Sequence, residues 1–178
     1  FWRDVGRNAA GFVAFACAGI VLNIYLVSSL GAEALGIFNQ LYAAFVIAGQ
    51  VAVLGIHDSA QRHLSVLPRE LSSSTARGAV LASFLGATLV ALILLIISET
   101  YLSTLRSIEV GFGLRILAPG LVLFALNKTI FGILNGQRRF REFAIGQTLR
   151  GLLILIIGIM VAESSLHLGW LALCFSAT

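Results

Sequence analysis

Charged residues are scarce in this chain of 178 residues. Lys, Arg, Asp and Glu make up 11% of it, whereas apolar residues make up 58%. Soluble domains have about 25% charged and roughly 45–50% apolar residues. With a mean hydropathy of +0.97, the chain has more apolar surface than a soluble core of this length buries. The scarcity of charge therefore argues against a soluble domain and predicts an integral membrane protein.

Cysteine, proline and acidic residues are also few. Cys17 and Cys174 both lie in apolar segments, where they fit helix packing better than a disulfide or a metal pair. The net charge of +4 would suit nucleic acid, but the Arg residues lie in short clusters between apolar runs. We therefore expect no nucleic-acid partner.

Motifs for catalysis and for metal binding are missing as well. Gly111-Phe112-Gly113 lacks the third glycine and the preceding strand of a dinucleotide-binding motif. His57 and His63 have no matching cluster of Cys or carboxylate residues. We expect no catalytic residues, no metal site and no cofactor.

The sequence has instead a series of apolar runs of about 20 residues, the length that a helix needs to cross a bilayer. They predict an all-α polytopic transmembrane helix bundle that forms one domain over residues 1–178. Five complete spans are expected, and a sixth is truncated by the end of the chain. The predicted spans are 8–30, 36–56, 78–98, 112–134, 143–162 and 166–178. Because the chain starts with Phe1 and stops within an apolar run, we expect it to be a piece of a longer protein.

The Arg residues between the spans predict the orientation of the bundle. We expect residues 57–77 to be the longest polar loop, broken by Pro68 and the serine run that follows it. If the N-terminus is cytoplasmic, eight Arg residues are inside and only Arg106 is outside, as the positive-inside rule requires. The eight are Arg3, Arg7, Arg62, Arg69, Arg77, Arg138, Arg139 and Arg141.

Polar residues inside the spans are candidates for a functional site, because they are costly at membrane depth. Lys128 lies within the fourth span and Arg150 about two turns into the fifth. Both either face a cavity or snorkel to the headgroups. The second span has a polar face with i, i+4, i+7 spacing, which suits either a water-filled cavity or hydrogen bonds between helices. The face contains Asn39, Ala43, Val46, Gln50, Val53 and His57.

Small residues in the fourth span predict two local features. Gly132 and Gly136 form a small-xxx-small pair, which is typical of a close helix crossing. Pro119-Gly120 weakens the helix and is a candidate hinge.

Three motifs in register resemble the polysaccharide-biosynthesis (O-antigen type) lipid-linked oligosaccharide flippases of the multidrug/oligosaccharidyl-lipid/polysaccharide exporter superfamily. The family's first helix ends in Leu-Gly, an acidic residue, and Gly plus an aromatic residue, as in Leu30–Phe38. Its second helix closes with Gly and a short stretch to Arg, as in Leu54–Arg62. Residues Ile133–Arg141 resemble the turn after the fourth helix.

The resemblance implies two pseudo-symmetric six-helix lobes around a central cavity, with this chain as most of the N-terminal lobe. Such transporters move undecaprenyl-pyrophosphate-linked oligosaccharide across a bacterial or archaeal cytoplasmic membrane. Their partners are this substrate, membrane lipids and a coupling ion, H+ or Na+. The residues expected to line the substrate cavity are Arg150, Lys128, Asn39, Gln50, His57 and Arg62.

Three alternatives stay open. A drug/cation antiporter of the same superfamily should have acidic residues in its cavity, and here every carboxylate lies in a loop or at a span end. A membrane-bound glycosyltransferase should have an acidic catalytic motif in a loop, and none is present. A non-transporting membrane scaffold subunit is the third.

Overall fold

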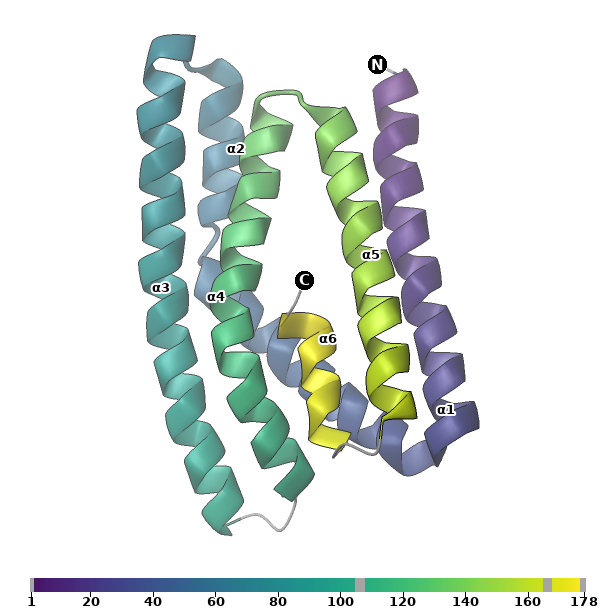
Figure 1. Cartoon of the computed structure of the whole chain (residues 1–178). Coiled ribbons are helices and arrows are strands. Elements are labelled where there is room, and N and C mark those ends of the chain that lie inside the picture. Colours follow the sequence, from purple (N-terminus) through teal and green to yellow (C-terminus); the bar gives the residue numbers. More distant parts are fainter. Residues whose placement is uncertain (1, 105–107, 165–167, 177–178) are drawn as a thin grey trace.

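The computed structural model describes residues 2–104, 108–164 and 168–176, and within these ranges every element is a helix (Figure 1). The prediction of an all-α bundle is therefore confirmed for the described residues. The α-helices are α1 (Trp2–Val53), α2 (Ile56–Val66), α3 (Arg69–Thr104), α4 (Ile108–Gly136), α5 (Phe140–Glu163) and α6 (Leu173–Ser176). A 3-10 helix, η1 (Leu168–Ala172), precedes α6.

Four of these helices are long and apolar enough to cross a membrane. The apolar segments are Ala9–Val53, Leu71–Thr100, Ile108–Gly136 and Phe140–Glu163. The predicted count of five complete spans and a truncated sixth is wrong. The first predicted span and all but the last three residues of the second lie in α1. The sixth is replaced, where it is described, by η1 and α6. These are five and four residues long, too short to cross a bilayer.

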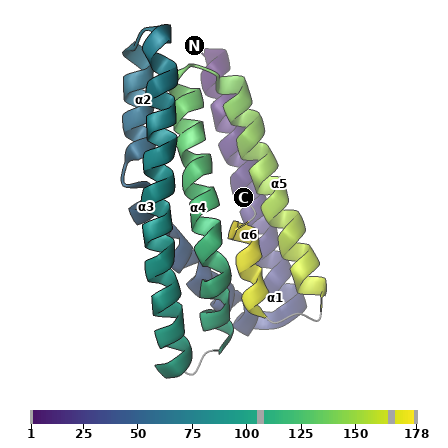
Figure 2. The same ribbon diagram turned by 60° about the vertical axis from the view of Figure 1, so that its left-hand side comes forward.

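The helix α1 is divided by a bend at Gly31. There φ is 85° and ψ is −179°, a combination that is essentially restricted to glycine. A straight helix over the 45 residues Ala9–Val53 of α1 would be about 67 Å long, roughly twice the thickness of the hydrocarbon core. The bend returns the chain into the bundle, so that the second arm of α1 passes behind α4 towards α2 (Figures 1 and 2).

The predicted polar loop at 57–77 is wrong, because the structure has helices there. After Leu54 and Gly55, both with positive φ, α2 begins at Ile56, and only Leu67 and Pro68 separate α2 from α3. This segment is helical because α2 is amphipathic: its apolar residues Ala60 and Leu64 are buried, while most of its polar residues are exposed. The serine run lies within α3, where the hydroxyl groups of Ser74 and Thr75 donate hydrogen bonds to the Leu71 carbonyl one turn earlier.

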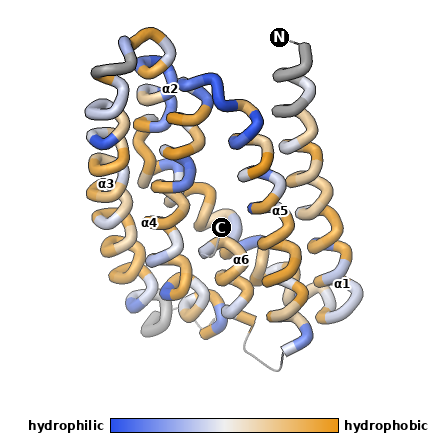
Figure 3. Tube along the Cα trace, turned by 45° about the horizontal axis from the view of Figure 1, so that its top comes forward, coloured by the Kyte–Doolittle hydropathy of each residue, from blue (hydrophilic) through white to orange (hydrophobic). Residues whose placement is uncertain are grey.

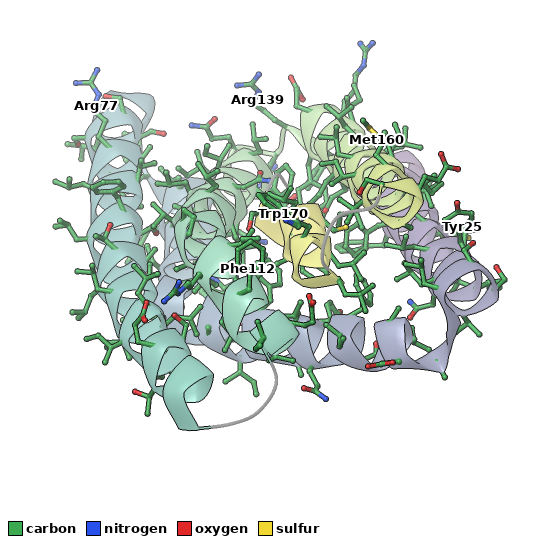
Figure 4. All side chains as sticks on the ribbon, turned by 60° about the horizontal axis from the view of Figure 1, so that its bottom comes forward. Tyr25, Arg77, Phe112, Arg139, Met160 and Trp170 are labelled. Carbon is green, nitrogen blue, oxygen red and sulfur yellow. The ribbon has the colours of Figure 1, made fainter. Side chains whose placement is uncertain are left out.

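The basic segments gather at one end of the bundle. The N-terminus, the connection between α2 and α3, and the turn between α4 and α5 all lie at this end (Figure 1). Hydrophilic residues colour α2 and the α4–α5 turn, whereas most of the long helices is apolar (Figure 3). We call this the basic end. The Gly31 bend lies at the opposite end, where Phe112 of α4 packs edge-on against Trp170 of η1, with ring centroids 5.3 Å apart (Figure 4).

The long helices form two pairs. The first arm of α1 lies along α5, and α3 lies along α4 (Figures 1 and 2). A buried hydrogen bond of 2.6 Å between Ser83 Oγ and Thr129 Oγ1 joins α3 to α4. The helices α4 and α5 diverge from their shared turn, and α6 lies between them (Figure 1). In α6, Ser176 Oγ donates a hydrogen bond of 2.9 Å to the Ile116 carbonyl of α4.

Candidate functional site

A cavity of about 460 Å³ lies between the two helix pairs. It is lined by residues of α1, α2, α4, α5 and α6. The cavity opens to the outside of the bundle, because the lining residues Phe12 and Tyr42 are exposed. Eight of the lining residues are aromatic: Phe12, Phe15, Tyr42, Phe45, Phe124, Phe131, Phe143 and Phe175. The polar lining residues are Gln50, His57, Gln61, Lys128, Asn135, Gln147 and Arg150.

Four of the six predicted site residues line this cavity, namely Gln50, His57, Lys128 and Arg150. Asn39 lines a smaller cavity of about 180 Å³, which adjoins the first because both include Tyr42 and Phe175. Arg62 is exposed on α2 and is not among the residues of either cavity. The structure therefore brings five of the predicted residues to two adjoining cavities and leaves Arg62 apart.

The Lys128 side chain is held within the cavity. Its Nζ donates a hydrogen bond of 3.0 Å to Gln50 Oε1, which links α4 to the second arm of α1. The same Nζ lies 5.8 Å from the centroid of the Phe124 ring, within the range of a cation–π interaction.

Arg150 reaches the same ring from α5. Its Cζ lies 5.1 Å from the centroid of Phe124 and 5.1 Å from that of Phe15 on α1. Its Nε is buried and has no hydrogen-bond partner within the described part of the protein. The guanidinium is thus stabilised by two aromatic rings, while at least one of its N–H groups is unused.

His57 reaches the cavity through α2 rather than through the second span. The predicted polar face does not continue to His57, because α1 ends at Val53 and the backbone breaks at Gly55. His57 Nε2 lies 3.3 Å from Asp58 Oδ1, and its Nδ1 is buried without a partner in the described residues. Of the other residues on that face, Val46 lines the cavity and Val53 is fully buried in the core.

The crossing of α2 and α4 beside this cavity is close. A Cβ added at Gly132 would lie 2.5 Å from the His57 carbonyl oxygen, and one at Gly136 would lie 2.8 Å from that of Gln61. The prediction of a close helix crossing at the small-xxx-small pair is confirmed. At the candidate hinge, α4 continues as a helix through Pro119, and Gly120 packs against Ser176 of α6.

The cavity is positively charged. Its lining includes Lys128 and Arg150, and no Asp or Glu is among the described lining residues. The carboxylate of Asp58 is exposed beside His57, outside the lining. The two cations also lie at similar depth, because Lys128 is eight residues before the end of α4 and Arg150 ten residues after the start of α5. At 1.5 Å per residue these positions are about 12 and 15 Å from the basic end.

The aromatic residues of the site are not among the predicted site residues. Phe124 precedes Lys128 by four residues and Gln147 precedes Arg150 by three, so each pair shares a helix face. This spacing was the available signal.

The chain matches no protein-family model, no curated protein and no solved structure.

Proposed function

We propose that this chain forms one lobe of a membrane flippase that moves a lipid-linked oligosaccharide for polysaccharide biosynthesis. The substrate is an undecaprenyl-pyrophosphate-linked oligosaccharide, which crosses from the cytoplasmic to the outer leaflet of a bacterial or archaeal cell membrane. The observation that supports this function is the pair Lys128 and Arg150 in an aromatic cavity within helices of membrane-spanning length.

A bound anion explains why two cations are kept at this depth. An intramembrane Lys or Arg costs about 2.5–3.5 kcal/mol at the bilayer centre on insertion scales, and less nearer the surface. One amide and two rings offset only part of this, whereas phosphate oxygens form charge-assisted hydrogen bonds with both side chains. A pyrophosphate therefore fits the lining, and its isoprenoid tail would stay in lipid.

The orientation is part of the proposal. With the N-terminus cytoplasmic, the basic end faces the cytoplasm, as the distribution of Arg residues favours, and a headgroup would enter from this side. An ion gradient, of H+ or Na+, would drive the cycle.

The alternatives have less support. A drug/cation antiporter needs carboxylates for its cationic substrate, and the described lining has none. A scaffold subunit that does not transport gives no reason for two cations inside the bundle.

The proposal is tested in liposomes that contain the whole protein and a fluorescent undecaprenyl-pyrophosphate oligosaccharide, with an impermeant quencher added outside. We expect flipping by the parent protein, a rate lower by about tenfold for Arg150→Ala, and partial activity for Arg150→Lys, which keeps the charge but loses the planar fork. If Arg150→Ala and Lys128→Ala both flip the lipid at the parental rate, the site assignment is wrong.

A further inference from the structure

Phe124 lines the cavity and is held in place by its neighbours. Its side chain is 8% exposed, and its ring packs edge-on against Phe45, with centroids 4.7 Å apart. The ring also touches the backbone of α1, since a Cβ at Gly49 would come within 2.7 Å of Phe124 Cε1. Phe45 and Gly49 are one turn apart on α1, so the second arm of α1 holds the ring from two positions.

Both cations of the cavity lie against this one ring. Lys128 Nζ is 5.8 Å and Arg150 Cζ is 5.1 Å from its centroid. Lys128 follows Phe124 by one turn of α4, whereas Arg150 comes from α5. The ring is therefore a fixed point of contact for two positive charges on helices that diverge from each other.

The ring's electrostatics suit this role. Two like charges repel in a site of low dielectric constant, and the negative face of an aromatic ring attracts each of them. Gln50 also holds Lys128, and Phe15 also holds Arg150, but Phe124 is the neighbour that the two cations share. Without this shared ring, we expect the distance between the two charges to increase.

We propose that Phe124 is a positioning residue that sets the separation of Lys128 and Arg150, and that this separation makes the cavity select an anion with two adjacent phosphates over an anion with one. The inference rests on the proposed function and deepens it. A pyrophosphate presents oxygens to both cations at once. A single phosphate pairs with one cation and leaves the other desolvated without an anionic partner. The free energy that the second pairing contributes is the source of the selectivity.

The test compares the affinity of the detergent-solubilised protein for undecaprenyl pyrophosphate with that for undecaprenyl monophosphate. Inorganic pyrophosphate and orthophosphate, as soluble arms, separate recognition of the headgroup from recognition of the tail. The variants are Phe124→Leu, which is apolar without a ring, and Phe124→Tyr, which keeps the ring. Phe112→Leu is the matched control, because it removes a ring from the same helix outside the cavity.

We expect the parent protein, Phe124→Tyr and Phe112→Leu to prefer the pyrophosphate lipid. Phe124→Leu should lower this preference on the order of tenfold, through weaker binding of the pyrophosphate with binding of the monophosphate unchanged. If Phe124 had a merely structural role, its loss would lower the affinity for both lipids equally. If Phe124→Leu does not fold, Phe124→Met, which refills the space without a ring, takes its place.

Two results would overturn the inference. If Phe124→Leu keeps the parental preference, or loses affinity for both lipids alike, Phe124 does not position the cations, although the proposed function stands. If the parent protein binds neither lipid, the proposed function fails and the inference fails with it.

Discussion

The Lys128 ammonium and the Gln50 amide oxygen are joined by a hydrogen bond of 3.0 Å across the cavity. A neutral amide satisfies one of the three N–H donors of the lysine and leaves its charge uncancelled. The bond therefore directs the charge into the cavity and leaves donors for an anion. Lys128 is in this way held in place by a neutral neighbour, as the proposed anion-binding role requires.

Replacing Lys128 with Met should slow flipping by about tenfold, the loss of one charge-assisted hydrogen bond of about 1.5 kcal/mol. The melting temperature should not fall, because Met keeps the apolar stem and removes a charge from membrane depth. Initial rates in liposomes and thermal unfolding in detergent measure the two effects.

Arg115→Met is the matched control. Arg115 is another cation of α4, but it is exposed and paired with Glu99 of α3, outside the cavity. It should flip substrate at the parental rate. Equal losses in the two variants would show that total charge matters, and not the position of Lys128.

The bend of α1 should depend on the glycine at position 31. Gly31→Ala places a Cβ on a backbone with φ of 85° and ψ of −179°, which costs on the order of 1–3 kcal/mol. We expect a lower melting temperature and less protein in the membrane. Gly36→Ala is the control, because Gly36 is helical with open space around it, so alanine there should be neutral or slightly stabilising. Equal melting temperatures for the two variants would argue against the bend.

The sequence predicts the long helices well because an uncharged apolar run has few alternatives to a membrane-spanning helix. The predicted segments 78–98, 112–134 and 143–162 fall within α3, α4 and α5. It predicts α2 poorly, since the apolar side of that helix is short and its polar residues look like a loop. The geometry at Gly31 is also not predictable, because a tight turn and a one-residue bend have the same composition.

The site is predictable only in its polar half. A charge or amide within an apolar run stands out, so Gln50, Lys128 and Arg150 are found from the sequence. In the aromatic half only Phe124 has a sequence signal, its spacing of four residues from Lys128. The other aromatic residues have none, because phenylalanine has the same hydropathy against lipid as inside a cavity. The chain has 12 Phe, and the fold alone determines which of them line the site.

The hydrogen bond between Ser83 and Thr129 should couple α3 to α4. In a double-mutant cycle with Ser83→Ala and Thr129→Val, we expect a coupling energy of about 0.6 kcal/mol, the average for such bonds in membrane bundles. Reversible unfolding in mixed micelles measures it. The pair Thr88→Val and Thr148→Val is the control, since these hydroxyl groups bond to carbonyls of their own helix. A coupling near zero for Ser83 and Thr129 would mean that packing alone holds the two helices together.

The basic end should face the cytoplasm. In a background with Cys17→Ser and Cys174→Ala, a Ser73→Cys variant in intact cells should resist an impermeant thiol reagent, whereas Ala32→Cys near the Gly31 bend should react. The reason is the gathering of Arg residues at the end that contains Ser73. Permeabilised cells, in which both should react, provide the control. Labelling of Ser73→Cys but not of Ala32→Cys in intact cells would invert the proposed orientation.

The contact between Gly132 and the His57 carbonyl should couple the α2–α4 crossing to the cavity. An alanine at position 132 needs a shift, because its Cβ would lie 2.5 Å from a backbone oxygen, and a backbone atom does not move aside as a side chain does. Movement of α2 displaces His57 from the cavity lining, so Gly132→Ala should lower both the melting temperature and the flipping rate. Gly78→Ala, in open space on α3, should change neither.

Added substrate separates the effect of Gly132→Ala on the fold from its effect on the cavity. A ligand that binds only the folded state stabilises it according to concentration and affinity, so a damaged cavity reduces the stabilisation that substrate gives. The Gly132→Ala variant could have a lower melting temperature and still gain as much stability from undecaprenyl pyrophosphate as the parent protein. That result would mean that the α2–α4 crossing supports the fold without shaping the cavity.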